Sequence, residues 1–494
     1  MNLQFGKKSI PYLRTIKNGV ESREQTQEVR LTDGMPDIGY VLSCWGQVLI
    51  RGKEWHTGGI AVNGGVMAWV LYMPDDGSQP QCVETWLPFQ MKWDFEAPTQ
   101  DGAICVQPSI VSVDARSTSA RKIMVRACID VLAQAKIKDT AEIGIPEDLP
   151  EDICILQNTY PMMLPAEGGE KPFSLEEVME LQFDTAQINK ILYYNLSTKV
   201  TEQKLLTDKL IFRGIATLKM LYMEPDGKLC SWTGDVPFSQ YAELDQDYTE
   251  HAESSVCVVV TNLELDKTNE GKLVLKAGLL GQYTIFDRIN VTVVEDAYSL
   301  KHKLRLQTEN LNLPAVLDTV TETVRVQHPV GDGSWLPADV EFYPALPRMY
   351  RDETGIGGDL SGVFHVLGCT DDSQLNGVTF QWSDSWNLPV DPGVKTEIQL
   401  QSGRAGVDNG NATAELHLTV RLLADQNMSA VTGLELYEDA IAVTDRPSLI
   451  LRRKGELSLW ELAKMAGSTV EAIECANDLL QEPAPDKMLL IPVF

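Results

Sequence analysis

Several features of exported, membrane and metal-binding proteins are missing from this 494-residue chain. Its nine cysteines are scattered and never form a CxxC pair, so we expect no zinc site, no disulfide framework and a reducing compartment. No stretch reaches the roughly 18 uninterrupted apolar residues that a membrane-spanning helix needs. Met1–Pro11 lacks the apolar core of an export signal. We therefore expect a cytoplasmic protein without membrane insertion.

Positive charge is also scarce. The chain has 42 Lys and Arg residues against 70 Asp and Glu residues, a formal net charge of -28. Nucleic acids and anionic lipid surfaces are held mainly by Lys and Arg, so neither is expected as a partner. The same charge can simply keep a protein in solution, or it can match a basic protein partner. Protein partners therefore stay open.

Residue patterns for catalysis are absent as well. The sequence has no GxSxG elbow, no phosphate-cradling GxxxxGK[ST] loop and no HExxH pair. None of its six histidines has another at helical ligand spacing. His365 and His417 lie in alternating segments, which favours a solvated strand face over a catalytic base. We expect no enzyme, no cofactor and no metal.

What the chain does contain is repetition. Three blocks recur at one offset of about 150 residues, which indicates tandem copies of a large unit. The pairs are Ile38–Leu42 with Ile188–Leu192, Gly64–Tyr72 with Gly214–Tyr222, and Arg121–Ala127 with Gly271–Ala277. A lead-in at Ser174-Leu175 is matched at Ser299-Leu300, which predicts a third copy from about residue 297, with an insertion between about His328 and Gly358. Repetition of this kind favours a scaffold or adaptor over an enzyme.

Within each copy the pattern is that of strands and turns. Ala216, Leu218 and Met220 alternate with polar positions, as in a strand with one buried face. Turn residues follow at Pro225-Asp226-Gly227 and, in the first copy, at Asp75-Asp76-Gly77, which predicts hairpins. Short apolar segments of strand length, separated by turn residues, recur across residues 25–435. The fold is therefore expected to be mainly β, with three tandem β-sandwich or barrel-like domains.

Proline and glycine mark the expected boundaries. Pro146, Pro150, Pro161, Pro165 and Gly168-Gly169 make the surrounding segment the best linker candidate. The predicted organisation is a β domain over residues 1–140, a linker over 141–173, β domains over 174–296 and 297–437, and a small domain over 438–494.

The last fifty residues change character. Short apolar segments at Ser448–Arg453 and Met488–Val493 predict two strands. Between them, Ser458 and Ser468 each precede a glutamate by three residues, the signature of a capped helix start. The tail is thus predicted to fold as β-α-α-β.

This tail resembles the LysM module, through Gly455 to Trp460, Leu462-Ala463, Thr469 to Ile473, Asn477 and Leu490-Ile491-Pro492. In glycan-binding LysM modules the sugar lies between the loop that opens the first helix and the loop that leaves the second. Carried over by position, the resemblance implies a binding site made of Gly455, Glu456, Leu457, Ser458, Leu459, Asn477, Asp478 and Leu479. The same positions also fit plain structural roles, with Trp460 and Ile473 in a core and Asn477 ending a helix.

The repeated unit resembles the SPOCS repeat of sporulation proteins from spore-forming Firmicutes. The resemblance rests on the Ser-Leu to Leu-Gln lead-in, the strand ending in Leu-Tyr, the Asp-Gly turn, Pro-Phe-Ser-Gln at 237–240 and Lys-Leu-Val-Leu-Lys at 272–276. It is clear across about residues 25–135 and 174–290, and partial across 297–435.

SPOCS repeats followed by one LysM module are the arrangement of SipL-type spore morphogenetic proteins. The resemblance implies a non-catalytic adaptor at the forespore surface, in the mother cell, which binds the coat basement-layer morphogenetic ATPase through its LysM-like tail. An alternative is a protein that binds peptidoglycan or N-acetylglucosamine polymers at the spore cortex or cell wall.

Overall fold

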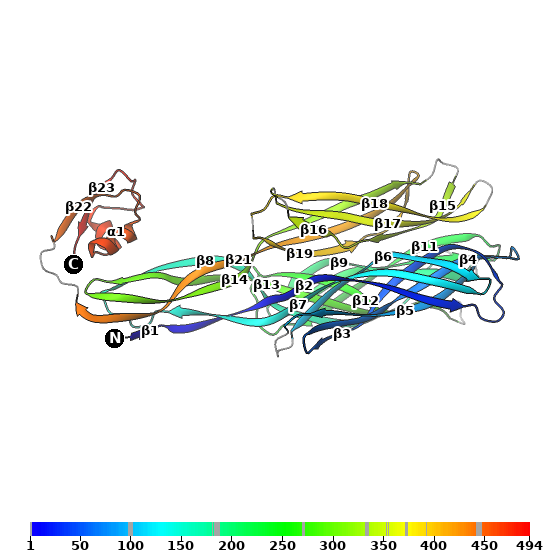
Figure 1. Cartoon of the computed structure of the whole chain (residues 1–494), viewed down its shortest axis with the longest axis horizontal. Coiled ribbons are helices and arrows are strands. Elements are labelled where there is room, and N and C mark those ends of the chain that lie inside the picture. The colour runs from blue at the N-terminus through cyan, green and yellow to red at the C-terminus, as the bar shows by residue number, and fades with distance from the viewer. Residues whose placement is uncertain are drawn as a thin grey trace.

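The computed structural model describes residues 2–96, 102–179, 181, 188–268, 272–330, 335–351, 353, 355–370, 374–391, 393–440 and 447–494. Strands make up 76% of it and helices 3%, so the predicted mainly β class is confirmed. Figure 1 shows an elongated body, here called the rod, with a small module at one end, here called the tail. No helix among the described residues is long and apolar enough to cross a membrane.

The first repeated unit consists of a long opening strand, a three-stranded meander and a closing hairpin. These are β2 (Gly6–Arg30), then β3 (Ile38–His56), β4 (Gly59–Pro74) and β5 (Gln81–Asp94), then β6 (Ala103–Ser119) and β7 (Lys122–Ile145). The meander forms one sheet and the order β2-β7-β6 forms another. The buried faces of the two sheets share one apolar core, which includes Val62, Phe89, Ile129 and Val131. The unit is therefore a β-sandwich.

The second unit repeats this plan, and the third repeats it with small interruptions. The second comprises β8 (Ile153–Val178), β9 (Lys190–Leu205), β10 (Lys209–Met223), β11 (Leu229–Glu243), β12 (Glu253–Lys267) and β13 (Leu273–Ser299). The third comprises β14 (His302–Pro329), β15 (Trp335–Pro344), β16 (Arg348–Arg351), β17 (Ile356–Thr370), β18 (Leu375–Leu388), β19 (Lys395–Ser402), β20 (Gly406–Asp408) and β21 (Asn411–Ala440). Short β1 (Asn2–Gln4) adds to the edge of β21. In the third unit β15 and β16 together pair with β17 as β9 alone pairs with β10.

Strand register shows how closely the first two units agree. Gly64 pairs with Ile50, and Gly214, 150 positions later, pairs with Val200; a bulge lies beside each glycine. The closing hairpins carry a bulge after the Ile110 to Ile129 pair and after the Val260 to Leu279 pair, again 150 positions apart. Bulges are specific local features, so their recurrence at one offset supports duplication of a single unit. The hairpins expected at both Asp-Gly turns are confirmed.

The segment 141–173, expected as a linker, is instead largely strand. Its first residues end β7, and residues from Ile153 onward form β8, which pairs along its length with β13. The linker prediction was wrong because it rested on prolines, which usually interrupt a sheet. Here the other side of β8 is almost unpaired, with a single bridge to β14 between Met163 and Val316. A strand with one open side tolerates proline, so this segment opens the second unit.

Two further expectations about the copies are wrong. The matched lead-ins occupy different places, because Ser174 lies near the end of opening strand β8 whereas Ser299 ends β13. The expected insertion between His328 and Gly358 contains β15 and β16, which belong to the common plan. Part of that stretch lies outside the described residues. The exact domain boundaries stay a prediction.

The three units pack around one another in a closed ring. Strand β3 of the first unit contacts β12 of the second, β9 of the second contacts β19 of the third, and β15 of the third contacts β6 of the first. A shared core joins the meanders: Trp45 stacks on Tyr193 with ring centroids 5.0 Å apart, and Leu367 of the third unit packs in the same cluster. The units therefore form one body rather than three beads on a string.

This packing buries strand faces that the sequence pattern predicted to be exposed to solvent. Ala216, Leu218 and Met220 are buried as predicted, yet Lys219 and Leu221 on the opposite face are buried too. His365, expected on a solvated strand face, is 5% exposed, and its Nδ1 lies 3.1 Å from the Cys44 carbonyl oxygen of the first unit. The interpretation of His365 was wrong because a neighbouring unit covers that face.

At one end the rod narrows into a stalk. The long strands of all three units extend there, and Ile10, Val293 and Leu313 contribute to one small core between them. Strands β1, β21, β14, β8, β13 and β12 follow one another in one sheet along the rod, in which a single bridge joins β14 to β8. Figure 1 shows the tail beside the free end of this stalk.

The tail has the predicted β-α-α-β order. It comprises β22 (Leu449–Arg453), α1 (Leu459–Ala466), α2 (Val470–Ala476) and β23 (Met488–Pro492), with β22 and β23 antiparallel. Ser458 caps α1 through a capping box with Glu461, as expected. The cap of α2 is Thr469, which accepts from the Ala472 N–H, and not Ser468. Ser468 is fully buried where the chain turns between the helices.

Candidate partner-binding site

The tail builds its core from one side of each element. Leu462, Ala463 and Ile473 of the helices are completely buried, together with Leu489 and Ile491 of β23. These residues recur at helical spacing in α1 and at alternate positions in β23, so each element has one face on the core. The remaining faces are available to neighbours.

The first predicted loop is partly structural. Leu459 is 4% exposed and belongs to the core, and Ser458 is engaged in its capping box. The hydrogen bonds from Ser458 lower the pKa of Glu461. Gly455 has a φ of +65°, the left-handed region that favours glycine, and open space lies beside it. Of this loop, Glu456 and Ser458 are exposed, Gly455 is half-buried, and Leu457 is half-buried against the core.

The second predicted loop is anchored by Asn477. Its side-chain amide donates to the carbonyl oxygens of Ile473 at 2.8 Å and Leu490 at 2.7 Å, and its oxygen accepts from the Leu490 N–H at 2.8 Å. An amide with these bonds ties α2 to β23 and has little left for a ligand. Asp478 is exposed and Leu479 is half-buried. Asn477 thus has the structural role of ending the helix.

The structure brings the two loops together. The Gly455 N–H donates to the Pro485 carbonyl at 2.9 Å, and the buried Lys454 Nζ lies 3.2 Å from Glu482 Oε1. Both partners belong to the segment that leaves the second loop. Leu480, just after that loop, is fully exposed. The eight predicted positions therefore lie in one region, divided between exposed residues and residues that hold the fold.

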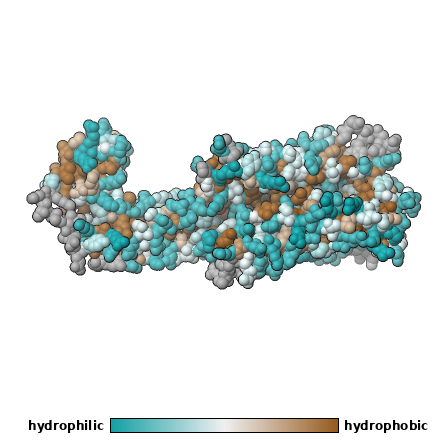
Figure 2. All heavy atoms as spheres, in the orientation of Figure 1, coloured by the Kyte–Doolittle hydropathy of each residue, from teal (hydrophilic) through white to brown (hydrophobic). Residues whose placement is uncertain are grey.

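A second surface was missed by the sequence analysis. The outward face of the two-stranded sheet, here called the apolar sheet face, consists of Leu449, Leu451, Met488 and Leu490, which are 51%, 63%, 48% and 37% exposed. Leu451 pairs directly with Leu490, so the side chains lie on the same side. Figure 2 shows a brown area on the outer side of the tail. The signal was in the sequence: both strands are apolar at consecutive positions, although only one face can meet the core.

A third face of the tail is occupied by the rod. The Trp460 indole N–H donates to Asp296 Oδ2 at 2.8 Å, and Lys464 Nζ lies 2.7 Å from both oxygens of Asp296. Tyr298 meets Trp460 edge to face at 4.8 Å, and its hydroxyl donates to the Ser468 carbonyl at 2.7 Å. Trp460 therefore docks the tail on the end of β13. It was expected in the core of the tail, and it lies partly buried at the edge of that core.

Asp296 is the electrostatic centre of this docking contact. Burial alone would raise the pKa of its carboxyl, but Lys464 and the Trp460 N–H bond to the ionised form and hold its pKa below the usual value. The contact is therefore made by the carboxylate and is strongest where Asp296 is ionised. With α1 against the rod, the apolar sheet face and the exposed loop residues point away from it.

The fold defines a class of mainly β proteins with repeated two-sheet units and a small α/β module at the end. Comparison with known families adds one match: residues 187–268 match the family described as SipL, SPOCS domain. The matched segment runs through the meander of the second unit and β12. This supports a SipL-like family and a role in sporulation, and SipL proteins are non-enzymatic. No curated protein and no solved structure matches the chain.

Proposed function

We propose that this protein is a non-catalytic adaptor in spore envelope assembly, with the rod as spacer and the tail as the part that captures a protein partner. The observation that carries the proposal is the apolar sheet face. Four large apolar side chains exposed on a two-stranded sheet are unfavourable in water unless a partner covers them. Apolar residues clustered at the centre of a surface supply most of the energy of a non-obligate interface.

The proposed partner is the coat basement-layer morphogenetic ATPase, and the proposed place is the mother-cell side of the forespore surface. Support comes from the SPOCS domain match, together with the resemblance of the tail to LysM modules. The exposed loop residues Glu456 and Asp478, with the half-buried Gly455, Leu457 and Leu479, would extend the contact from the apolar sheet face. Catalysis has no part in the proposal.

Glycan binding is the weaker alternative. A sugar site needs polar groups free to bond hydroxyls, and the Asn477 amide is already committed to Ile473 and Leu490. A glycan would also gain little from aliphatic side chains such as Leu451 and Leu490. Trp460, which could stack on a sugar ring, lies in the contact with the rod.

The test compares capture of the purified ATPase and retention on purified peptidoglycan, using the full chain and a double variant, Leu451→Glu with Leu490→Glu. Both side chains point outward, so the tail should still fold. We expect the variant to bind the ATPase at least about tenfold more weakly, a loss of about 1.4 kcal/mol. Leu206→Glu, at an exposed apolar residue of the rod, is the matched control and should bind as the parent does.

Two outcomes would contradict the proposal. Undiminished ATPase capture by the double variant would exclude the apolar sheet face. Retention on peptidoglycan with no capture of the ATPase would favour the glycan-binding alternative.

A further inference from the structure

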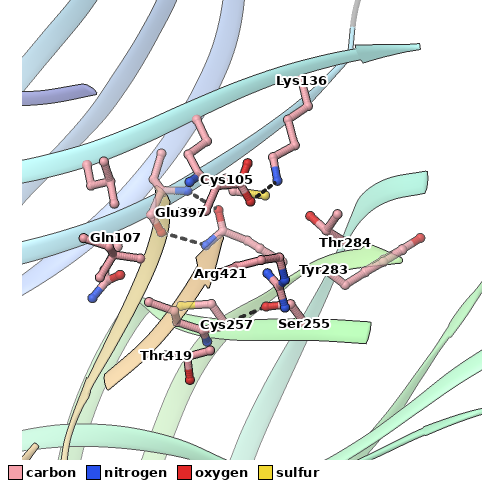
Figure 3. A pocket seen from close by; sticks show the side chains of 16 residues that line it. Cys105, Gln107, Lys136, Ser255, Cys257, Tyr283, Thr284, Glu397, Thr419 and Arg421 are labelled. Atoms are coloured by element: carbon pink, nitrogen blue, oxygen red, sulfur yellow. Dashed lines mark hydrogen bonds and ion pairs between the residues drawn. The ribbon is translucent and has the colours of Figure 1, made fainter. Parts of the chain in front are cut away.

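The closing hairpins of the three units line a small cavity, partly open to solvent, where the units meet. Its volume is about 60 Å³, room for a few water molecules or a small ion. Figure 3 shows the lining side chains, which come from the closing hairpins of all three units. Cys105 pairs with Gln134 in the first unit, Ser255 with Thr284 in the second, and Glu397 with Arg421 in the third. These three pairs hold the same place in each unit.

Only in the third unit is this cross-strand pair made of charged residues. Glu397 and Arg421 stand where the other units have neutral side chains, and Lys136 of the first unit reaches the same cavity. Lys136 Nζ lies 2.9 Å from Glu397 Oε2, and the Thr15 hydroxyl donates to Glu397 Oε1 at 3.2 Å. Lys136, Glu397 and Arg421 are 2%, 8% and 8% exposed. The lining thus holds two cations and one carboxylate, all deeply buried.

Arg421 is the cation of this cavity that lacks a close ion pair among the described residues. Glu397 and Glu253 attract it from a distance, but Glu397 bonds Lys136, and no carboxylate among the described residues comes within ion-pair distance of Arg421. Its guanidinium lies 3.9 Å from the ring centroid of Phe286, and its buried Nε finds no hydrogen-bond partner in the described part of the chain. Burial accordingly lowers the pKa of Arg421. A buried positive charge that is only partly compensated is costly, and such groups are normally paired.

Two glutamine side chains of the lining are satisfied by neighbouring strands. The Gln282 amide donates to the Val106 carbonyl and accepts from the Val106 N–H, both at 2.8 Å. The Gln399 amide donates to the Val256 carbonyl at 2.8 Å and accepts from the Ser255 hydroxyl at 3.0 Å. Among the charged groups of the lining, the two cations exceed the one carboxylate by one positive charge, and Arg421 holds the buried N–H without a partner in the described part of the chain.

We infer that the central cavity binds a small monovalent inorganic anion, of the class of chloride, which bonds Arg421 and neutralises the excess charge where the three units meet. Such an anion would contact groups from separate units. Its binding would therefore stabilise the closed ring relative to any arrangement in which the units have separated. A polyatomic anion such as sulfate would carry more charge than the site lacks.

The test uses the full chain with sodium chloride and sodium gluconate at equal ionic strength, because gluconate is too large for the cavity. We expect chloride to raise Tm by about 1–3 °C with saturation, since a ligand that binds only the folded state stabilises it by mass action. Arg421→Gln should abolish the difference between the two salts. Arg404→Gln, at an exposed arginine paired with Asp235, is the control and should keep it.

A second variant covers the case in which Arg421→Gln fails to fold. Glu397→Gln removes the only carboxylate of the lining, so the half-saturating chloride concentration should fall at least about tenfold. Crystals grown with bromide should show anomalous scattering in the cavity. Equal Tm in both salts, a full chloride response in Arg421→Gln, or a cavity without bromide would each overturn the inference.

Discussion

The rod and the tail are held together in contrasting ways. Within the rod, three units share cores, and buried ion pairs such as Lys136 with Glu397 cross from one unit to another. The tail meets the rod through a smaller contact, in which Asp296 bonds α1 and Tyr298 joins the apolar core of the tail, with Cys154 and Leu300 packed against that core. A large shared core couples parts into one cooperative body, whereas a small contact leaves them separable. The difference indicates a rigid spacer that presents a detachable module.

The largest effect should come from breaking the seam between units. Trp45 is completely buried and stacks on Tyr193 of the second unit. Trp45→Ala should lower the free energy of unfolding of the rod by about 3–5 kcal/mol, because it removes a large side chain from a packed core. Trp460→Ala in the tail is the matched change and should leave the rod transition in place. Urea denaturation followed by circular dichroism measures both, and equal effects of the two variants would contradict the contrast.

A pH-dependent effect should come next. Burial lowers the pKa of His365 from 6.5 to about 4. The unfolded state therefore binds the proton first, so stability is full above pH 6.5 and is lost as pH falls toward 4. The loss should reach about 3 kcal/mol, at about 1.36 kcal/mol per pH unit.

The measurement is urea denaturation of the full chain at several pH values. His365→Gln should flatten the profile between pH 6.5 and 4, since glutamine does not titrate. The exposed His251→Gln is the control and should keep the parental slope. A parental slope in His365→Gln would show that other groups carry the effect.

The smallest effect should be seen at the docking contact. Asp296→Asn removes the charge that holds Lys464, which should weaken docking by about 1 kcal/mol or less, because a partly exposed ion pair contributes little. Amide hydrogen exchange in α1 should become up to about fivefold faster while exchange in the rod is unchanged. Asp114→Asn, at an ion pair on the first unit, is the control. Faster exchange throughout the rod would contradict a separable tail.

The strands and turns of each unit could be predicted from the sequence better than the packing of the units against one another. Blocks such as Gly64–Tyr72 and Gly214–Tyr222 revealed the offset, and the Asp-Gly turns located the hairpins, because these are local properties. The opening strand β8 was hidden by Pro161 and Pro165, which its open side tolerates. The packing of the three units into a closed ring could not be predicted from the sequence. It depends on which faces meet, and residues such as Lys219 resemble surface residues until a neighbour covers them.

The candidate site was predicted in part. The capping pattern at Ser458 and the apolar periodicity located α1 and its loop correctly. The role of Asn477 as a helix-ending residue fits its bonds to Ile473 and Leu490. The apolar sheet face was missed because an apolar run in a short strand is usually assigned wholly to the core. Only the fold shows that Leu451 and Leu490 remain 63% and 37% exposed.

Pulsed hydrogen exchange of the full chain in increasing urea tests the central claim, that three repeated units form one body with a separable tail. Peptides from β4, β10 and β17, the middle strands of the three meanders, should lose protection at the same urea concentration. Peptides from α1 and α2 should lose it independently. Loss of protection in one unit while the other two stay protected would contradict the closed ring.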